Sequence, residues 1–271
     1  MEQYDKKLPK YEAQISSDIE KYKKGDCVLK LIDKDGKPLA NTKVTINQTG
    51  HDFKYGANIF LLDEFGNDEE NQKYRDVFHR FFNIATVPFY WAELEPQEGK
   101  LRFDADSPKI YRRPAPDLCL DYCKEHGMEA KLHCLFYDKF TPAWLPKRDA
   151  AEMKRLYEKR FAEIAERYNG KMYEYEVTNE LLDEYRWKGA WAGSVLCEYK
   201  DTPLWCYQTA RKYFPDGKLV LNEAQRLPEL AQKDYRSEMY MFVENLLLRG
   251  APIDKIGIQN HIFSGKRAPQ E

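Results

Sequence analysis

The tripeptide Thr178-Asn179-Glu180 sets a carboxylate beside an amide donor, a pairing suited to general acid–base chemistry. It follows a strand-like run at residues 173–177. In a parallel α/β barrel the active site is built at the carboxyl ends of the strands, so we expect Glu180 at that edge. The alternative is that Glu180 opens a helix near Leu181, because acidic residues are common in first turns.

Further polar residues fall where other predicted strands end. His133 lies near the end of the third strand, Asn222 and Glu223 follow the fifth, and Gln259 and His261 close the sixth. Each of these residues also has a purely structural explanation. His133 could be hydrogen-bonded within the core, Asn222 could open a turn, and His261 could bond to a backbone carbonyl. Their convergence on one barrel rim favours an active site.

The elements that must position these residues alternate between short apolar runs and helical segments. The predicted strands are 53–59, 82–87, 129–136, 173–177, 219–221 and 255–259, and the predicted helices are 69–80, 115–126, 150–168, 202–213 and 228–249. This alternation favours βαβ units and a parallel sheet. Because no glycine-rich phosphate loop follows the first strand, we predict an α/β fold of the (β/α)₈ TIM barrel type rather than a doubly wound sheet.

Residues 1–50 are predicted to precede the barrel as a charged, helical lead-in and a small β-rich element. In that element a hairpin joins residues 27–32 to 42–47 through an Asp-Gly turn. The barrel then occupies 51–271, with six units visible where eight are expected. We therefore expect an incomplete barrel, either a fragment of a longer product or half of a split barrel. Its open strand edges favour self-association.

The composition argues against several classes of binding partner. The chain has 43 basic and 45 acidic residues without a basic stretch, so no nucleic-acid partner is expected. The polar amino terminus lacks the apolar core of a signal peptide, and the longest apolar runs are too short to span a membrane. Cys119, Cys123 and His126 share a helix face without a fourth ligand, so reduced thiols are expected and no metal site.

The motifs resemble those of glycoside hydrolase family 10, the endo-β-1,4-xylanases. The sequence YEVTNE at residues 175–180 is similar to the family's acid/base motif WDVVNE, and IDKIGIQNH at residues 253–261 is similar to its strand-six motif. Asn222 resembles the family's strand-five asparagine, and His133 resembles its strand-three histidine. The resemblance covers about residues 53–264.

The resemblance implies a retaining glycosidase that cleaves internal bonds of xylan or a related β-glycan, with Glu180 as acid/base and no cofactor. Asn179 would bind the sugar 2-hydroxyl, while Gln259 and His261 would orient the nucleophile. Tyr137 and Trp91 would offer stacking faces. The residues that the resemblance assigns to substrate binding are His133, Asn179, Tyr137, Trp91, Gln259, His261 and Asn222. Members of the family are typically secreted or at the cell surface, which leaves the localisation of this chain open.

Several departures limit the resemblance. The family's strand-two motif is replaced by VPFYW at residues 87–91, and Tyr137 stands where the family has tryptophan. The family's nucleophile, a glutamate after strand seven, has no counterpart here, and Glu223 on strand five is a poor substitute. Two alternatives follow: a glycan-binding fragment or pseudo-enzyme without turnover, and an unrelated α/β protein whose motif matches are accidental.

Overall fold

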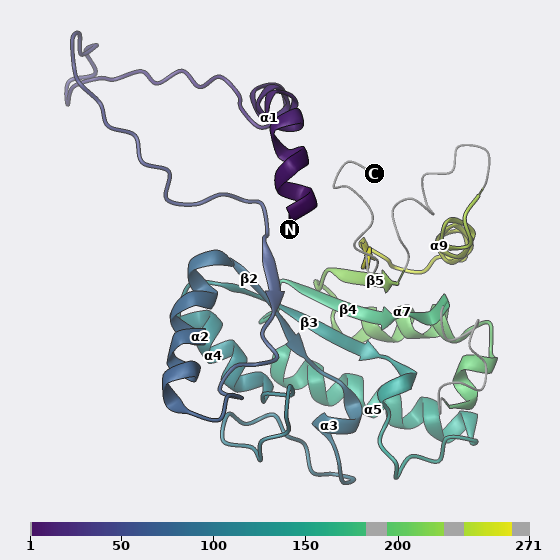
Figure 1. The fold of residues 1–271 in the computed structure, drawn as a ribbon. Coiled ribbons are helices and arrows are strands. Elements are labelled where there is room, and N and C mark those ends of the chain that lie inside the picture. The colour runs from purple at the N-terminus through teal and green to yellow at the C-terminus, as the bar shows by residue number, and fades with distance from the viewer. Residues whose placement is uncertain (1, 183–193, 225–235, 262–271) are drawn as a thin grey trace. The chain divides into compact units, whose positions relative to one another are not determined.

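Six parallel strands form the centre of the computed structural model, which describes residues 2–182, 194–224 and 236–261. The strands follow one another across the sheet in chain order, from β1 to β6. Their bounds are Gly56–Asn58 (β1), Ile84–Pro88 (β2), Glu129–Phe136 (β3), Glu174–Asn179 (β4), Leu219–Glu223 (β5) and Lys255–Ile258 (β6). The sheet curls into a half-barrel (Figure 1), which confirms the predicted partial (β/α)₈ fold.

One helix precedes the first strand, and the others lie between successive strands in the chain. Their bounds are Glu2–Tyr22 (α1), Asp68–Phe81 (α2), Trp91–Leu94 (α3), Pro116–Glu125 (α4), Ala150–Tyr168 (α5), Thr202–Tyr213 (α7) and Glu238–Leu248 (α9), with short 3₁₀ turns at Asp138–Phe140 (η1) and Val195–Glu198 (η2). The helices of the barrel part begin and end within a few residues of the predicted limits, except that residues 228–235 of the last prediction lie outside the described residues. Local signals explain these limits; for example, the Asp149 carboxylate caps α5 by accepting from the N–H groups of Ala151 and Glu152.

The outer face of the sheet packs against this helical layer. Helix α4 contacts β2 and β3, and α7 contacts β4 and β5. Tyr207 of α7 is fully buried there, and its hydroxyl lies 2.9 Å from the Thr178 hydroxyl of β4. The apolar core therefore lies between strands and helices, which leaves the inner face of the sheet for polar side chains.

Residues 1–52 belong to a separate unit from residues 53–263. Helix α1 lies in the stretch for which the sequence predicts a helical lead-in. The Asp33 side chain accepts from the N–H groups of Asp35 and Lys37, and this turn pairs Ile32 with Pro38. The predicted pairing of 27–32 with 42–47 is not seen, since residues 42–47 are described and form no strand. The Asp-Gly sequence thus predicted the position of the turn correctly but did not predict how many residues pair on either side of it.

The sequence also raised questions about its cysteines, metal binding and membrane spans. No disulfide joins any of the six cysteines. Burial raises the pKa of Cys119 and brings that of Cys123 to about 12. Within the described ranges no group of three potential metal ligands occurs. None of the helices that the structure describes is long and apolar enough to cross a bilayer.

Candidate active site

A buried carboxylate, Glu176 of β4, forms the centre of the polar inner face. On β3 the buried residues Ala130 and Leu132 alternate with Lys131 and His133, which places the latter two on the inner face. His133 pairs in register with Glu176. One carboxylate oxygen of Glu176 forms an ion pair with the Lys131 ammonium group, and the other lies within hydrogen-bond reach of His133 Nδ1.

The ionisation of Glu176 follows from these contacts. Its side chain is 2% exposed, and burial alone would raise its pKa. The charges and hydrogen bonds of His133 and Lys131 outweigh that effect and hold the pKa of Glu176 below its ordinary value. Glu176 is therefore an anion at neutral pH and a fixed acceptor at the centre of the site.

A chain of amides links this carboxylate to the rim. Asn222 Nδ2 donates to Glu176 Oε2 at 3.2 Å and to Asn179 Oδ1 at 2.8 Å. Gln259 Nε2 donates to the same Asn179 oxygen at 3.0 Å, and its own Oε1 lies 2.9 Å from His261 Nε2. Four of the predicted site residues therefore meet in one hydrogen-bonded network that spans β4, β5 and the end of β6.

A glycine makes room for this network. A Cβ atom added at Gly257 of β6 would lie 2.5 Å from Asn222 Oδ1, closer than real Cβ contacts allow. Asn222 and Gly257 face each other in the β5–β6 ladder. Gly257 is therefore required by the close approach of the Asn222 side chain rather than by a turn.

An irregularity in the strand pairing decides which side chains reach the inner face. The register of β4 with β5 shifts between Glu176 and Thr178. Thr178 then contacts the helical layer, whereas Glu176 and Asn179, three residues apart, both bond to Asn222 on the inner face. If side chains alternated regularly along β4, Asn179 would point to the outer face. The bulge therefore changes the direction of the Asn179 side chain to the inner face.

Glu180 lies just beyond this bulge. Its backbone adopts φ of 56°, a left-handed conformation that is uncommon for residues other than glycine and frequent at functional sites. Its N–H donates to the Asn222 carbonyl at 3.0 Å, and the Tyr137 hydroxyl donates to its carboxylate. Burial and this hydrogen bond raise the pKa of Tyr137, so the phenol remains a donor. Glu180 is only partly buried and remains accessible from the rim.

Glu223, the neighbouring carboxylate on β5, has a different environment. It is fully buried, and its two oxygens accept from the N–H groups of Leu181 at 3.0 Å and Leu182 at 3.2 Å. These bonds tie the segment after Glu180 to β5. The carboxylate of Glu223 is thus engaged in fixing the backbone next to the rim.

His133 has partners on both ring nitrogens. Besides Glu176, the Tyr90 hydroxyl lies 2.9 Å from His133 Nε2, and the two rings meet edge to face. The guanidinium of Arg113 lies 4.1 Å from the centre of the Tyr90 ring. His133 therefore connects Tyr90 to the buried carboxylate, and its predicted contact with a sugar stays a prediction.

Trp91 lies in the core rather than at the rim. Its side chain is 3% exposed, its ring packs against Tyr157 and Trp144, and its Nε1–H donates to Glu95 at 2.8 Å. The interpretation of Trp91 as a stacking face is therefore wrong for this arrangement, because no face of the ring is left for a ligand. Tyr137 is at the rim, but it contributes a hydroxyl donor and only a small exposed area.

Sequence reasoning missed three residues of the site: Tyr90, Lys131 and Glu176. A signal for two of them was present, since Lys131 and His133 are two residues apart on one strand and Glu174 and Glu176 are two apart on the next. Opposite charges at this period on adjacent strands indicate a shared face and cross-strand pairs. For Tyr90, which follows β2 in a loop, the sequence offered no such pattern.

The sequence resembles a known protein family and several curated proteins. A model of glycosyl hydrolase family 10 matches residues 49–271. Endo-1,4-beta-xylanase 1 of Arabidopsis thaliana is 26% identical over 257 residues, which cover 92% of this chain and 25% of that protein. Endo-1,4-beta-xylanase B of Neocallimastix patriciarum is 31% identical over 156 residues, 56% of this chain and 18% of that protein.

The fold has solved counterparts. The structure of native xylanase 10B from Thermotoga maritima superposes with a TM-score of 0.58 at 21% identity, covering 75% of this chain and 58% of that chain. Xylanase XynB from Paenibacillus barcinonensis gives a TM-score of 0.58 at 22% identity, covering 77% and 60%. The chain thus spans about three-fifths of these solved proteins and a quarter or less of the two curated relatives.

Proposed function

The chain belongs to glycosyl hydrolase family 10, and from this premise we propose that it carries the acid/base half of a retaining site that hydrolyses internal β-1,4-xylosidic bonds of xylan. The observation that carries the proposal is the position of Glu180. It stands at the carboxyl end of β4, partly exposed, with a phenol donor on its carboxylate and the Asn179–Asn222–Gln259 network beside it.

The proposed reaction assigns one proton to Glu180. As the glycosidic bond breaks, Glu180 gives its proton to the leaving oxygen, and a second carboxylate attacks the anomeric carbon from the opposite face. Glu180, now an anion, then takes a proton from the water that releases the sugar. The hydrogen bond from Tyr137 orients this carboxylate toward the site.

The amide network serves the sugar and the second carboxylate. Asn179 lies beside Glu180 and presents its side chain to the inner face, where we assign it to the sugar 2-hydroxyl. Gln259 and His261 bond to each other at the end of β6, and we assign them to positioning the second carboxylate. Asn222 and His133 hold Asn179 and Glu176 in place and complete the substrate-binding set.

The second carboxylate is proposed to come from outside the described residues. A retaining mechanism requires two carboxyl groups about 5–5.5 Å apart. Glu223 is occupied by two backbone N–H groups, and Glu176 is held by Lys131 and His133. Because neither Glu223 nor Glu176 is available as a nucleophile, a second candidate function of the described residues is glycan binding without turnover.

External azide tests the proposal, because it can replace a missing carboxylate as nucleophile. It attacks the anomeric carbon to form a C–N bond while the C–O bond to the leaving sugar breaks, and the leaving oxygen takes its proton from Glu180. We expect residues 1–271 to bind xylohexaose and, with azide, to release an inverted glycosyl azide. Glu180→Gln should retain binding within about threefold and lose at least about a hundredfold in azide product, since general acid catalysis contributes 10²–10⁴.

Three results would contradict parts of this assignment. Azide product that is unchanged in Glu180→Gln removes Glu180 from the acid/base role. Loss of xylohexaose binding by the unmodified chain removes xylan as the substrate. Hydrolysis of xylan without azide would mean that residues 1–271 already supply a second carboxylate, which removes glycan binding without turnover as the alternative function.

A further inference from the structure

The guanidinium of Arg113 lies among three aromatic rings. Its central carbon lies over the Tyr90 ring, 4.1 Å from the ring centre, and lies 5.6 and 5.7 Å from the centres of the Phe140 and Phe60 rings. A guanidinium over an aromatic face is attracted by the ring quadrupole, and its planar shape allows it to stack there. These three rings therefore hold the cation in one position.

The same rings place Arg113 next to the proposed acid/base residue. The centre of the Tyr90 ring lies 6.1 Å from that of Tyr137, whose hydroxyl donates to the Glu180 carboxylate. The Tyr90 hydroxyl lies 2.9 Å from His133 Nε2. Arg113 is thus separated from the residue that contacts Glu180 by a single tyrosine ring.

A buried arginine, Arg102, fixes the backbone that carries Arg113. Arg102 is 6% exposed, and its guanidinium donates to three carbonyls, those of Glu93 at 2.7 Å, Pro108 at 2.8 Å and Arg113 at 3.3 Å. These bonds tie residues 108–113 to α3. A cation on an anchored backbone has less freedom to lose when a ligand binds, so binding costs less entropy.

The hydrogen-bond partners of Arg113 leave part of its guanidinium unused. Nη1 donates to the Arg112 carbonyl at 2.9 Å. Nε lies 3.6 Å from Glu93 Oε2, too far for a hydrogen bond, and both atoms lack a hydrogen-bond partner within the described ranges. Nη2 bonds to no other residue that the structure describes. The charge of Arg113 is therefore only loosely compensated, and Nη2 has two N–H donors for a ligand.

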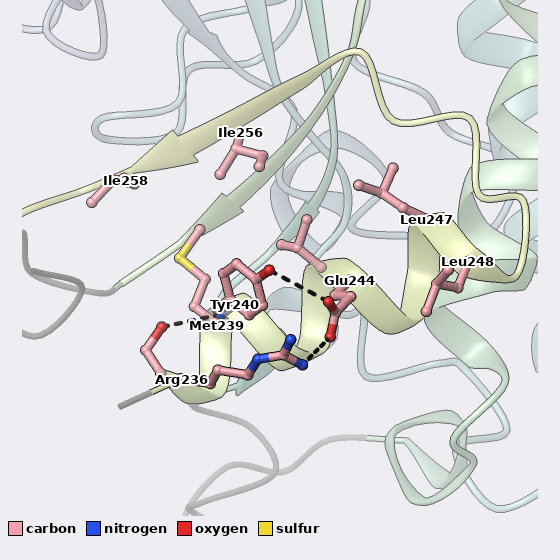
Figure 2. Close-up of a pocket in the computed structure, with 10 residues that line it drawn as sticks. Arg236, Met239, Tyr240, Glu244, Leu247, Leu248, Ile256 and Ile258 are labelled. Atoms are coloured by element: carbon pink, nitrogen blue, oxygen red, sulfur yellow. Dashed lines mark hydrogen bonds and ion pairs between the residues drawn. The ribbon is translucent and has the colours of Figure 1, made fainter. Parts of the chain in front are cut away.

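Arg236 shows, by contrast, an arginine whose charge is compensated. Its guanidinium also lies over a tyrosine, 5.2 Å from the centre of the Tyr240 ring. Figure 2 shows its bond to the Glu244 carboxylate, which is 2.9 Å long. A charge-assisted hydrogen bond of this length compensates both charges, whereas the 3.6 Å between Arg113 Nε and Glu93 Oε2 leaves both atoms without a bond.

The chemistry of Arg113 indicates which group would complete its set of partners. A planar guanidinium matches the two oxygens of a carboxylate, and such charge-assisted bonds are about twice as strong as neutral ones. A chain of unsubstituted xylose carries hydroxyl and ether oxygens but no charge. A uronic acid branch adds a carboxylate to the same chain.

We propose that Arg113 binds the carboxylate of a uronic acid branch, so that this site selects an acidic xylan over the unsubstituted chain. This inference rests on the proposed function and deepens it, since it names the substrate class of the same site. Arg113 determines specificity and takes no part in the proton transfer by Glu180. The preference weakens as the salt concentration rises, because salt screens the attraction between charges that water reaches.

Binding of matched oligosaccharides tests the selection. The ligands are xylohexaoses that each carry one glucuronic acid branch on a different sugar, and each matched control has the carboxylate of its branch reduced to an alcohol. By isothermal titration calorimetry, we expect residues 1–271 to bind at least one acidic isomer at least about tenfold more tightly than its reduced form, the equivalent of 1.4 kcal/mol. Equal affinities for every acidic isomer and its reduced form would overturn the proposal.

Variants assign the preference to one residue. Arg113→Met should bind both forms with equal affinity, and Arg113→Lys should keep part of the preference, because an ammonium group retains the charge without the planar fork. Arg236→Met, which removes the arginine paired with Glu244, should keep the preference in full. Circular dichroism checks that each variant is folded. A preference that survives in Arg113→Met, or one that Arg236→Met also loses, would refute the role of Arg113.

The same titrations separate this inference from the proposed function. If unbranched xylohexaose binds and no acidic isomer binds more tightly than its reduced form, the selection by Arg113 is wrong and xylan stands as the substrate. If neither the unbranched nor any branched oligosaccharide binds, the proposed substrate is wrong, and the selection is refuted with it.

Discussion

Removing Lys131 should strongly destabilise the barrel unit and do so in a pH-dependent way. Lys131 supplies one of the two charges that neutralise Glu176, which is 2% exposed. Breaking a buried ion pair by deleting one partner costs about 3–5 kcal/mol, because the remaining charge stays buried without compensation. Since Lys131 is itself 24% exposed and Glu176 keeps its bonds to His133 and Asn222, we expect Lys131→Met to cost about 3 kcal/mol, at the lower end.

The pH dependence follows from the direction of the pKa shift. The folded-state pKa of Glu176 is lowered, so its ionised form contributes stability above the unfolded pKa of about 4.3, and this contribution is lost as pH falls through the folded pKa. Lys131 stabilises only the ionised form of Glu176, and Lys131→Met removes this stabilisation. The difference in stability between the variant and the unmodified chain should therefore be fully present near neutral pH and be lost as the pH falls below about 4.3 and through the folded pKa of Glu176.

Urea titration followed by tryptophan fluorescence measures both effects. With a slope near 3 kcal/mol/M, a loss of about 3 kcal/mol moves the midpoint by about 1 M. Lys131→Met/Glu176→Gln should recover part of the loss, because it removes the uncompensated charge. Arg155→Met, which breaks an exposed ion pair with Glu152, is the matched control and should leave the midpoint unchanged. A Lys131→Met midpoint equal to that of this control at pH 7 would refute the reasoning.

Two further predictions concern the same network. Gly257→Ala should destabilise the barrel unit by about 1–3 kcal/mol, because the new methyl group meets the Asn222 side chain at 2.5 Å; urea titration measures the loss. Tyr90→Phe should cost about 1 kcal/mol, the value of the hydrogen bond to His133, and leave the fold intact by circular dichroism.

Each of these variants has a control in the chain. Gly66→Ala adds a methyl group where no atom lies within 4 Å, and should leave stability nearly unchanged. Tyr111→Phe removes the hydroxyl of a tyrosine that is 71% exposed and should have no effect. Gly257→Ala as stable as Gly66→Ala would mean that Asn222 can move aside freely, and Tyr90→Phe as stable as Tyr111→Phe would mean that the hydroxyl contributes nothing to folding.

The sequence alone was sufficient for the architecture and for much of the rim. Alternation of apolar runs with helical segments gave the parallel sheet and the order of its strands, because period and length are local properties of a segment. Placing His133, Asn179, Asn222 and Gln259 at strand ends was enough to predict that they meet, since the carboxyl ends of parallel strands share one edge. The length of the hairpin in residues 27–47 was not predictable in this way, because pairing depends on partners distant in the chain.

The tertiary structure decided which of these side chains face one another. The register shift between Glu176 and Thr178 turns Asn179 inward, and a shift of this kind depends on the neighbouring strand rather than on the residues themselves. Burial of Trp91 among other rings, and the contact of Tyr90 with His133, likewise depend on segments more than forty residues away in the chain. Residue types and periodicity therefore determined the chemistry that this chain can hold, whereas packing between distant segments determined the geometry in which it is held.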